Sequence, residues 1–307
     1  MSPLSRQIEQ YIQLRRALGY KLEREGQLLP DFATFLEGIG ATHITSELAL
    51  RWATMPASAT VWWWAYRLSI VRRFAQYVHA FDARNEIPPR DLLPSTKSRR
   101  LTPYVYSEDD VLALMEATNM LPGLKAHTYA TLIGLLAATG MRVGEVLALD
   151  RTDINWQTGI LVVRHAKFGK SRGLPLHSTT VQALLAYNDG RDRCLLRRHS
   201  PAFLLSLAGT RLLYKNVHFT FLRLLHQAGL AERHPRRPRI HDLRHTFAIN
   251  TLLRWHQEGI DVSSHLPALS TYLGHVNPSN TYWYLTATPE LLQLAAGRLE
   301  QALGERS

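Results

Sequence analysis

The sequence predicts a mainly α-helical protein with one small antiparallel β-sheet, divided into two domains. Apolar residues recur at three- and four-residue steps over most of the chain, whereas one stretch near the middle has the pattern of two short strands. A proline-rich, basic segment separates the two parts, and 307 residues, 46% of them hydrophobic, are enough for two cores. We therefore expect a helical domain over 1–93, a linker over 94–104 and an α+β domain over 105–307.

Helical periodicity is clearest in the N-terminal part, where a helix is expected over 59–83. Trp62 and Tyr66 begin its apolar stripe, and three arginines between the apolar positions predict a basic face beside it. The spacing predicts Trp62 as a core residue. Because Trp63 and Trp64 follow directly, at least one of them is a candidate to contact a binding partner.

The segment that follows has three prolines between residues 88 and 94 and three basic residues between Pro94 and Pro103. Proline interrupts helices, so this segment is expected to link the domains. Its charge is compatible with two interpretations, a linker that lies along phosphate groups and an ordinary solvated linker.

The C-terminal part is expected to begin with a helix that Ser107 caps. Two strands, Gly159–Arg164 and Gly173–Leu176, are predicted around a basic turn, which gives the antiparallel sheet. Further helices are expected over 127–149, 178–195, 214–229, 240–257 and 288–303.

The charge balance indicates a polyanionic partner. Lysine and arginine number 36 against 25 aspartates and glutamates, a formal charge of +11, so nucleic acid is the first candidate. No apolar run approaches the roughly 18 residues of a membrane span, and the first residues are too polar for a signal peptide, so a cytoplasmic protein is expected. Cys194 is the single cysteine, which excludes an internal disulfide and a cysteine-based zinc cluster.

Two short motifs combine arginine with a residue that can hold or assist it. Arg142 follows a glycine at a predicted helix boundary, and Glu145, three residues on, can orient its guanidinium. His241 and Arg244 have the spacing that places two side chains on one helix face, where both can contact one phosphate. Taken singly, the first motif is more often a surface ion pair, and the second can be a cap and a salt bridge. His241 and His245 also have the spacing of a metal pair, but no further ligand cluster is visible.

Two further segments supply other candidate groups. Lys167 lies in the basic turn between the predicted strands, with Lys170 as an alternative, and could reach a site or contact DNA backbone. His275 is followed nine positions later by Tyr284, while Tyr282 is expected to be a packing residue. Aromatic residues at such positions usually belong to a core.

The order and spacing of six residues decide between these interpretations. With these residues the chain resembles the tyrosine recombinases of the phage integrase class, over about 105–290, and the region before the linker resembles that family's core-binding domain in size and position. The resemblance implies six catalytic residues, with Glu145 supporting the first arginine: Arg142, Lys167, His241, Arg244, His275 and Tyr284.

The resemblance implies cleavage and rejoining of DNA strands through a 3′-phosphotyrosyl link on Tyr284, without a metal, ATP or other cofactor. Arginines and His275 neutralise the phosphate, His241 acts as base and Lys167 as acid. The implied partners are double-stranded DNA and other protomers in a tetramer, and a second recombinase is an open question. The C-terminal helix could dock on a neighbour or pack on its own domain. Integration, excision, dimer resolution and transposition of a mobile element share this chemistry.

Three rival functions remain at this point. A type IB topoisomerase uses a similar residue set on one duplex, but the size and the linker favour recombination. An accessory DNA-binding protein without catalysis would not need every expected polar residue. A metal-dependent nuclease would need clustered carboxylates near the histidines, which the sequence does not show.

Overall fold

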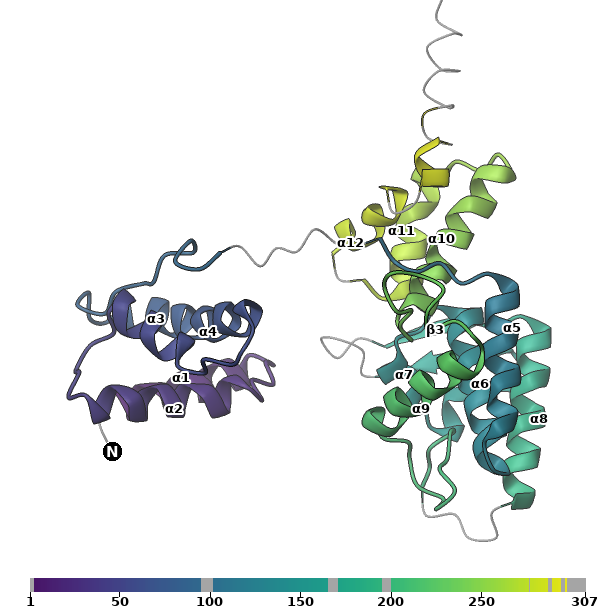
Figure 1. Cartoon of the computed structure of the whole chain (residues 1–307), viewed down its shortest axis with the longest axis horizontal. Coiled ribbons are helices and arrows are strands. Elements are labelled where there is room, and N and C mark those ends of the chain that lie inside the picture. Colours follow the sequence, from purple (N-terminus) through teal and green to yellow (C-terminus); the bar gives the residue numbers. More distant parts are fainter. Residues whose placement is uncertain are drawn as a thin grey trace, which may run out of the picture. The chain divides into compact units, whose positions relative to one another are not determined.

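The structure is a computed structural model that describes residues 3–94, 102–164, 171–194, 200–275, 277–286, 289–293 and 296. It divides the chain into two compact units, Met1–Leu101 and Thr102–Ser307 (Figure 1). The described residues are mainly helical, with one three-stranded antiparallel sheet. The predicted fold class is therefore confirmed, while the roles assigned to the two units remain predictions.

The N-terminal unit is a bundle of four helices: α1 (Pro3–Ala17), α2 (Glu25–Gly38), α3 (Ser46–Thr54) and α4 (Val61–His79). Helix α4 contacts the other three. Thr45 and Thr60 cap α3 and α4, each accepting a hydrogen bond at its hydroxyl from a backbone N–H of the first turn. Such caps satisfy donors that a helix start leaves open, so the two boundaries follow from local sequence.

Helix α4 differs from its predicted faces at two residues. Trp62 was expected in the core, but it is 53% exposed and stacks on Tyr66, with ring centroids 5.5 Å apart. Arg67 was expected on a basic face, but it is buried, lies over the Trp52 ring and donates to the Trp52 carbonyl at 2.9 Å. The stripe that α4 buries runs through Leu68, and an aromatic triplet at the helix start cannot all lie on it.

The C-terminal unit begins with α5 (Glu108–Glu116), which starts with a reciprocal cap between Ser107 and Asp110. The other helices follow in the order η1 (Ala117–Met120), α6 (Leu124–Thr139), α7 (Val143–Ala148), η2 (Arg151–Asp153), α8 (Ser178–Cys194), α9 (Tyr214–Gln227), α10 (Asp242–Gln257), α11 (Val262–Leu273), α12 (Ser279–Tyr282) and η4 (Trp283–Thr286).

The sheet consists of β1 (Ile154–Asn155), β2 (Ile160–Val163) and β3 (Arg172–Pro175), in the order β1-β2-β3. Leu161 pairs with Leu174 across β2 and β3, and both are fully buried. The two predicted strands are present. The segment between them includes 165–170, so Lys167 and Lys170 lie outside the described residues.

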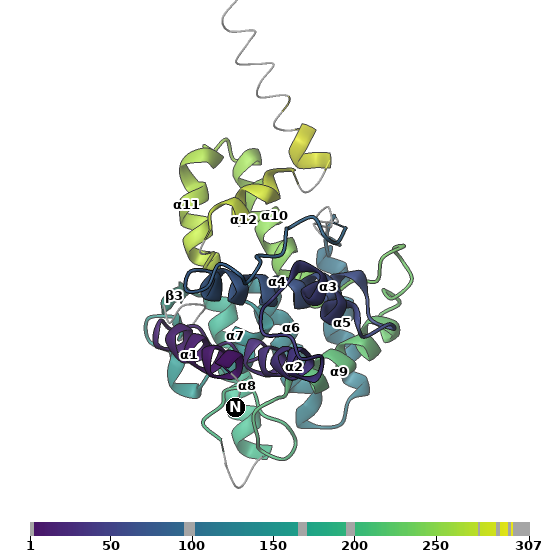
Figure 2. The same ribbon diagram turned by 90° about the vertical axis from the view of Figure 1, so that its left-hand side faces the viewer.

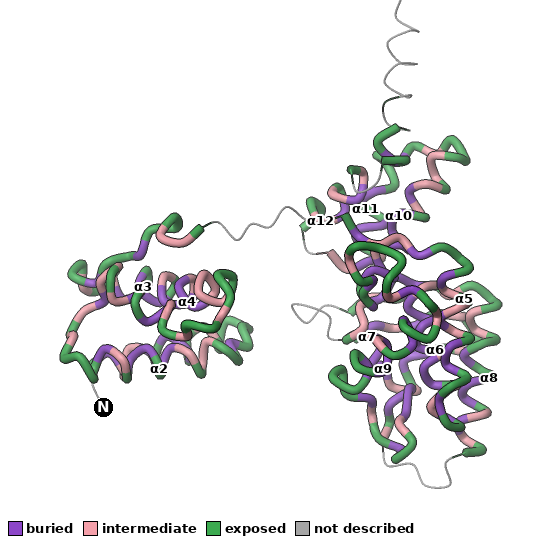
Figure 3. The backbone as a smooth tube through the Cα atoms, in the orientation of Figure 1, coloured by how far each residue is buried: buried purple, intermediate pink, exposed green. Residues whose placement is uncertain are grey.

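Helix α6 is the centre of this unit and contacts α5, α8 and α10. Figure 3 shows buried positions along most of its length, as expected for a helix with neighbours on several sides. Helices α10, α11 and α12 gather at one end of the unit in both views (Figures 1 and 2). Apolar residues of these helices and of η4 form a second core, which includes Leu252, Leu273 and Tyr284.

Two helical regions depart from the predicted boundaries. The helix expected over 127–149 is two helices, because Gly140 has φ +60° and ends α6. Helix α11 was not predicted, since Pro267 lies inside it and its first turns are polar. Of the helix expected over 288–303, only 289–293 and 296 are described, and they are helical.

Candidate active site

Arg142 stands between α6 and α7, where the chain turns after Gly140. Its Nη1 donates to Glu145 Oε1 at 2.8 Å, and its backbone N–H donates to Glu145 Oε2 at 3.0 Å. Glu145 thus holds both the side chain and the backbone of Arg142. The turn has no room for a larger residue at Gly140, where a Cβ would lie 2.5 Å from the Phe247 ring.

A second arginine shares the same carboxylate. Arg172, the first residue of β3, donates from Nη2 to Glu145 Oε2 at 2.8 Å and from Nη1 to Oε1 at 3.2 Å. Burial alone would raise the pKa of Glu145, but hydrogen bonds from Arg172 and Arg142 hold this pKa below its usual value. Glu145 is therefore a carboxylate at neutral pH, and it ties the start of β3 to the start of α7.

A third arginine, Arg244 of α10, is 2% exposed. It donates from Nη1 to the Gly140 carbonyl at 2.8 Å and from Nη2 to the Leu273 carbonyl at 2.7 Å. Burial and the nearby charge of Arg142 lower the pKa of Arg244 to about 10, so the side chain remains cationic at neutral pH. These two bonds use two of the five N–H donors of a guanidinium, which leaves capacity to bind an anion.

All three arginines meet the C-terminal end of α11. Arg172 Nε donates to the Tyr272 carbonyl at 2.8 Å, and Arg142 Nη2 donates to the Gly274 carbonyl at 3.0 Å, on either side of the Leu273 carbonyl that accepts from Arg244. The C-terminal end of a helix carries partial negative charge, which favours cations there. Three consecutive carbonyls thus gather three positive charges at one place.

Two histidines lie on α10 and its cap. His241 precedes the helix and is exposed, but the protein atoms around its imidazole, together with the charge of Arg244, lower its pKa. His245, one turn later, has its ring 4.8 Å from that of His241. Burial lowers the pKa of His245 to about 4, with a further contribution from His241. His245 is therefore uncharged at neutral pH.

Tyr284 lies in η4 and is 2% exposed. Its hydroxyl is 2.9 Å from His245 Nδ1, and its ring is 6.3 Å from the His275 ring, nearly parallel to it. His275 Nδ1 is 2.7 Å from the Thr281 hydroxyl. Tyr282 was expected to pack, but it is 51% exposed, because residues two apart in a helical turn face different sides.

The structure brings five of the six predicted residues, and Glu145, into one region around α10 and the end of α11. Lys167 is outside the described residues, and the catalytic roles of all six remain predictions. Sequence reasoning did not single out Arg172 and considered His245 only as a metal ligand. The signal for Arg172 was its place at the start of a strand, directly after the basic turn.

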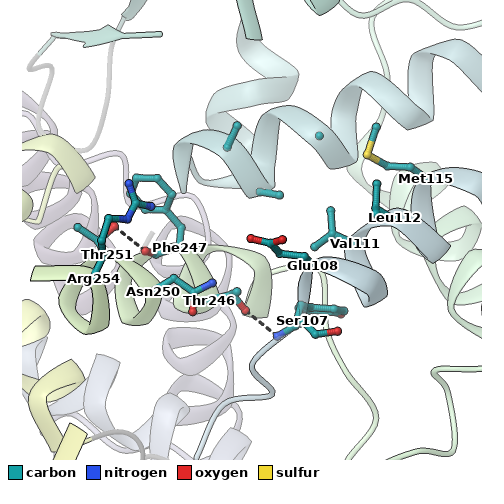
Figure 4. Close-up of a pocket in the computed structure, with 14 residues that line it drawn as sticks. Ser107, Glu108, Val111, Leu112, Met115, Thr246, Phe247, Asn250, Thr251 and Arg254 are labelled. Atoms are coloured by element: carbon teal, nitrogen blue, oxygen red, sulfur yellow. Dashed lines mark hydrogen bonds between the residues drawn. The ribbon is translucent and has the colours of Figure 1, made fainter. Parts of the chain in front are cut away.

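Three further observations concern the described residues outside this region. The described residues include no group of three or more His, Cys, Asp or Glu side chains placed to hold a metal ion. No helix among them is long and apolar enough to cross a membrane. A cavity of about 480 Å³ lies between α5, α6 and α10, lined by Val111, Met115 and Phe247 among others (Figure 4), and none of the predicted catalytic residues lines it.

The sequence model of the phage integrase family matches residues 105–290 of this chain. A putative integrase/recombinase of Sinorhizobium fredii, y4rB, is 42% identical over the full length of both chains. The tyrosine recombinase XerD of Staphylococcus epidermidis is 30% identical over 71% of this chain and 69% of its own.

Solved structures show the same fold. The Tn1549 transposon integrase, in complex with transposon right end DNA, superimposes with a TM-score of 0.68 at 15% identity, covering 96% of this chain and 98% of its own. A lambda integrase dimer bound to a core site gives a TM-score of 0.61 at 17% identity, covering 92% and 94%.

Proposed function

This chain belongs to the phage integrase family, and from that premise we propose that it is a site-specific recombinase that cleaves and rejoins DNA through a covalent link to Tyr284. The observation that carries the proposal is the convergence of Arg142 and Arg244, a hundred residues apart in sequence, on the end of α11, in the region where Tyr284 lies. Phosphodiester transfer needs a nucleophile, which Tyr284 can supply, and fixed positive charge to stabilise the phosphate, which the two arginines can supply.

The arginines address the first difficulty of this reaction. Attack on a phosphodiester builds charge on oxygens of a group that is already an anion. Arg142 and Arg244 are held by carbonyls and a carboxylate before any substrate binds, so they need little reorganisation to receive that charge. Each such preorganised donor is worth about 3 kcal/mol of the barrier. His275 matches a family position, and on that ground we propose it as a further hydrogen-bond donor to the phosphate.

The covalent step conserves bond energy. The Tyr284 oxygen attacks phosphorus, an O–P bond forms, the phenolic proton leaves to a base, and the bond to the 5′ oxygen breaks as that oxygen takes a proton. His241 as base and Lys167 as acid follow from the family resemblance. Reversal of these steps by a different 5′ hydroxyl reseals the strand, so the proposal requires neither ATP nor a metal.

The proposed partners are double-stranded DNA and further copies of this chain. A formal charge of +11 favours a polyanion. Because Tyr284 is buried, the scissile phosphate reaches it only if binding uncovers this side chain. Exchange of strands between two duplexes requires four active sites, for which we propose a tetramer on DNA. Two lambda integrase chains on one core site support the assembly of protomers on DNA.

The test is trapping of the covalent intermediate. Duplexes that the chain binds are first selected from a random pool. Each is then nicked close to the cleavage site, so that the short fragment with the 5′ hydroxyl dissociates after cleavage and the strand cannot be resealed. The wild-type chain is incubated with them in EDTA, beside Tyr284→Phe and, as matched control, Tyr282→Phe. Denaturing gels detect the adduct and mass spectrometry locates it.

We expect an adduct on Tyr284 that Tyr282→Phe retains and Tyr284→Phe lacks. Binding without any adduct would overturn the proposal in favour of an accessory DNA-binding protein. An adduct that requires a divalent metal would also contradict it. If the chain nicks and reseals one duplex but never joins two, a topoisomerase takes the place of the recombinase.

A further inference from the structure

The Tyr284 hydroxyl is hydrogen-bonded to a residue that the family resemblance did not assign. His245 follows Arg244 directly on α10, and its Nδ1 is 2.9 Å from the phenolic oxygen. The two rings are tilted, with centroids 5.5 Å apart. His241, which the resemblance implies as base, lies one helical turn earlier and is exposed, whereas His245 is partly buried. Geometry therefore places His245 at the reacting oxygen.

The charge state and the tautomer of His245 together set the direction of this bond. Burial and the neighbouring His241 hold its pKa at about 4, so the imidazole is neutral at neutral pH. A neutral imidazole has one acceptor nitrogen, whereas a protonated one only donates. Nδ1 can thus accept the phenolic hydrogen, with the ring proton on Nε2. So weak a base is suited to hold the hydroxyl rather than to remove its proton.

We propose that His245 is a positioning residue for Tyr284, accepting the hydrogen bond of its hydroxyl and so fixing the orientation of the nucleophile beside the arginines. The proposal rests on Tyr284 being the nucleophile, as proposed above. Tyr284 belongs to the apolar core around α10 and α11, so packing fixes its ring while His245 fixes the direction of its O–H. Attack rates depend steeply on such orientation.

Two substitutions with the same number of side-chain heavy atoms separate the hydrogen bond from packing. His245→Asn keeps an acceptor close to the position of Nδ1, while His245→Leu fills nearly the same space without a polar atom. Thermal unfolding and DNA affinity are measured for both, so that any loss of folding or binding is visible. Because Leu and Asn have the same number of side-chain heavy atoms and both branch at Cγ, a difference between the two variants that unfolding and DNA affinity do not explain reports the acceptor.

The first readout needs neither DNA nor activity. The chain is labelled with ¹³Cζ-tyrosine, and the Tyr284 signal among the 12 tyrosines is assigned from Tyr284→Phe. We expect this signal to shift in His245→Leu and to stay near its wild-type position in His245→Asn. An unchanged signal in both variants would show that the hydroxyl is not bonded to His245 and would overturn the proposal, whatever the activity.

The second readout is the single-turnover rate of the covalent adduct at saturating DNA. We expect His245→Leu to be slower than wild type by about 10- to 100-fold and His245→Asn to recover most of the rate. A Leu variant as fast as wild type, or faster, contradicts a positioning role. Failure of Asn to recover the rate contradicts it too and makes His245 the proton acceptor. If wild type forms no adduct, the proposed function fails, and the NMR result still decides the contact.

Discussion

The two sides of the candidate active site are held by different means. On one side, Arg142, Arg172 and Arg244 bond to backbone carbonyls and to one shared carboxylate. On the other side, Tyr284 lies on a short helical turn, and its hydroxyl is 2.9 Å from Nδ1 of a neighbouring side chain, His245. The cations are thus held mainly by main-chain acceptors, whereas the hydroxyl of the proposed nucleophile bonds to a side chain that substitution can remove.

Arg244→Lys should cause the largest loss, because it disrupts the side of the site that the fold fixes. A lysine cannot bond both the Gly140 and Leu273 carbonyls with the geometry of a guanidinium. We expect adduct formation to fall by about 10²- to 10³-fold in single-turnover assays, although the charge is kept. Arg254→Lys, an exposed position on the same helix, serves as control. Equal rates for Arg244→Lys and wild type would show that charge alone suffices.

Glu145→Gln removes the one negative charge that Arg142 and Arg172 share. Two guanidiniums would then face a neutral amide, so we expect the free energy of unfolding to fall by about 3 kcal/mol. Adduct formation should fall by about tenfold or more as Arg142 loses its fixed orientation. Chemical denaturation and the adduct assay measure the two effects. The same change at the exposed Glu232 should leave both unchanged.

Gly274→Ala tests how closely the arginines pack against the end of α11. Gly274 has φ +67°, and a Cβ there would lie 2.7 Å from Arg172 Nη1. Gly229 has nearly the same φ, +65°, but open space around it. We expect the alanine at 274 to destabilise the chain by about 1 kcal/mol more than the alanine at 229, measured by denaturant unfolding. Equal losses would mean that Arg172 moves aside without cost.

The last prediction concerns pH and the tyrosine side. The pKa of His245 is about 4 in the folded chain, below the usual value of about 6.5, so between these two pH values only the unfolded chain takes up this proton. The free energy of unfolding should therefore fall as the pH falls through this window, by at most about 1.4 kcal/mol per pH unit from this group. In His245→Asn this contribution disappears, so its stability should depend less on pH than that of wild type. Identical pH dependence would refute the burial of a neutral His245.

The sequence predicted the elements whose pattern is local and missed those that tertiary contacts decide. Two short apolar runs around a basic turn identified β2 and β3, and Ser107 identified the start of α5. Helix α11 escaped because Pro267 and a polar first turn argue locally against a helix. The aromatic triplet at the start of α4 allowed more than one helical phase, so Trp62 was wrongly assigned to the core.

The candidate site shows the same limit. The six family positions were predicted from the order and spacing of their residues in the sequence, and their roles remain predictions. Arg172 looked like one more solvated charge of a basic turn, since its partners, Glu145 and the Tyr272 carbonyl, are 27 and 100 residues away. His245 was considered only as a metal ligand together with His241. Nothing in the sequence indicates that Tyr284, 39 residues later, contacts the same helix.

The use of the end of α11 as an acceptor for three arginines has a consequence for how this chain can vary. Main-chain carbonyls are present whatever side chain a position carries, so substitutions at Tyr272 or Leu273 can alter packing without deleting an acceptor. The turn at Gly274 is the exception, because its conformation and its contact with Arg172 both exclude a side chain. The exposed positions of α11 can therefore be substituted without loss of these three acceptors, provided that the helix still ends at this glycine.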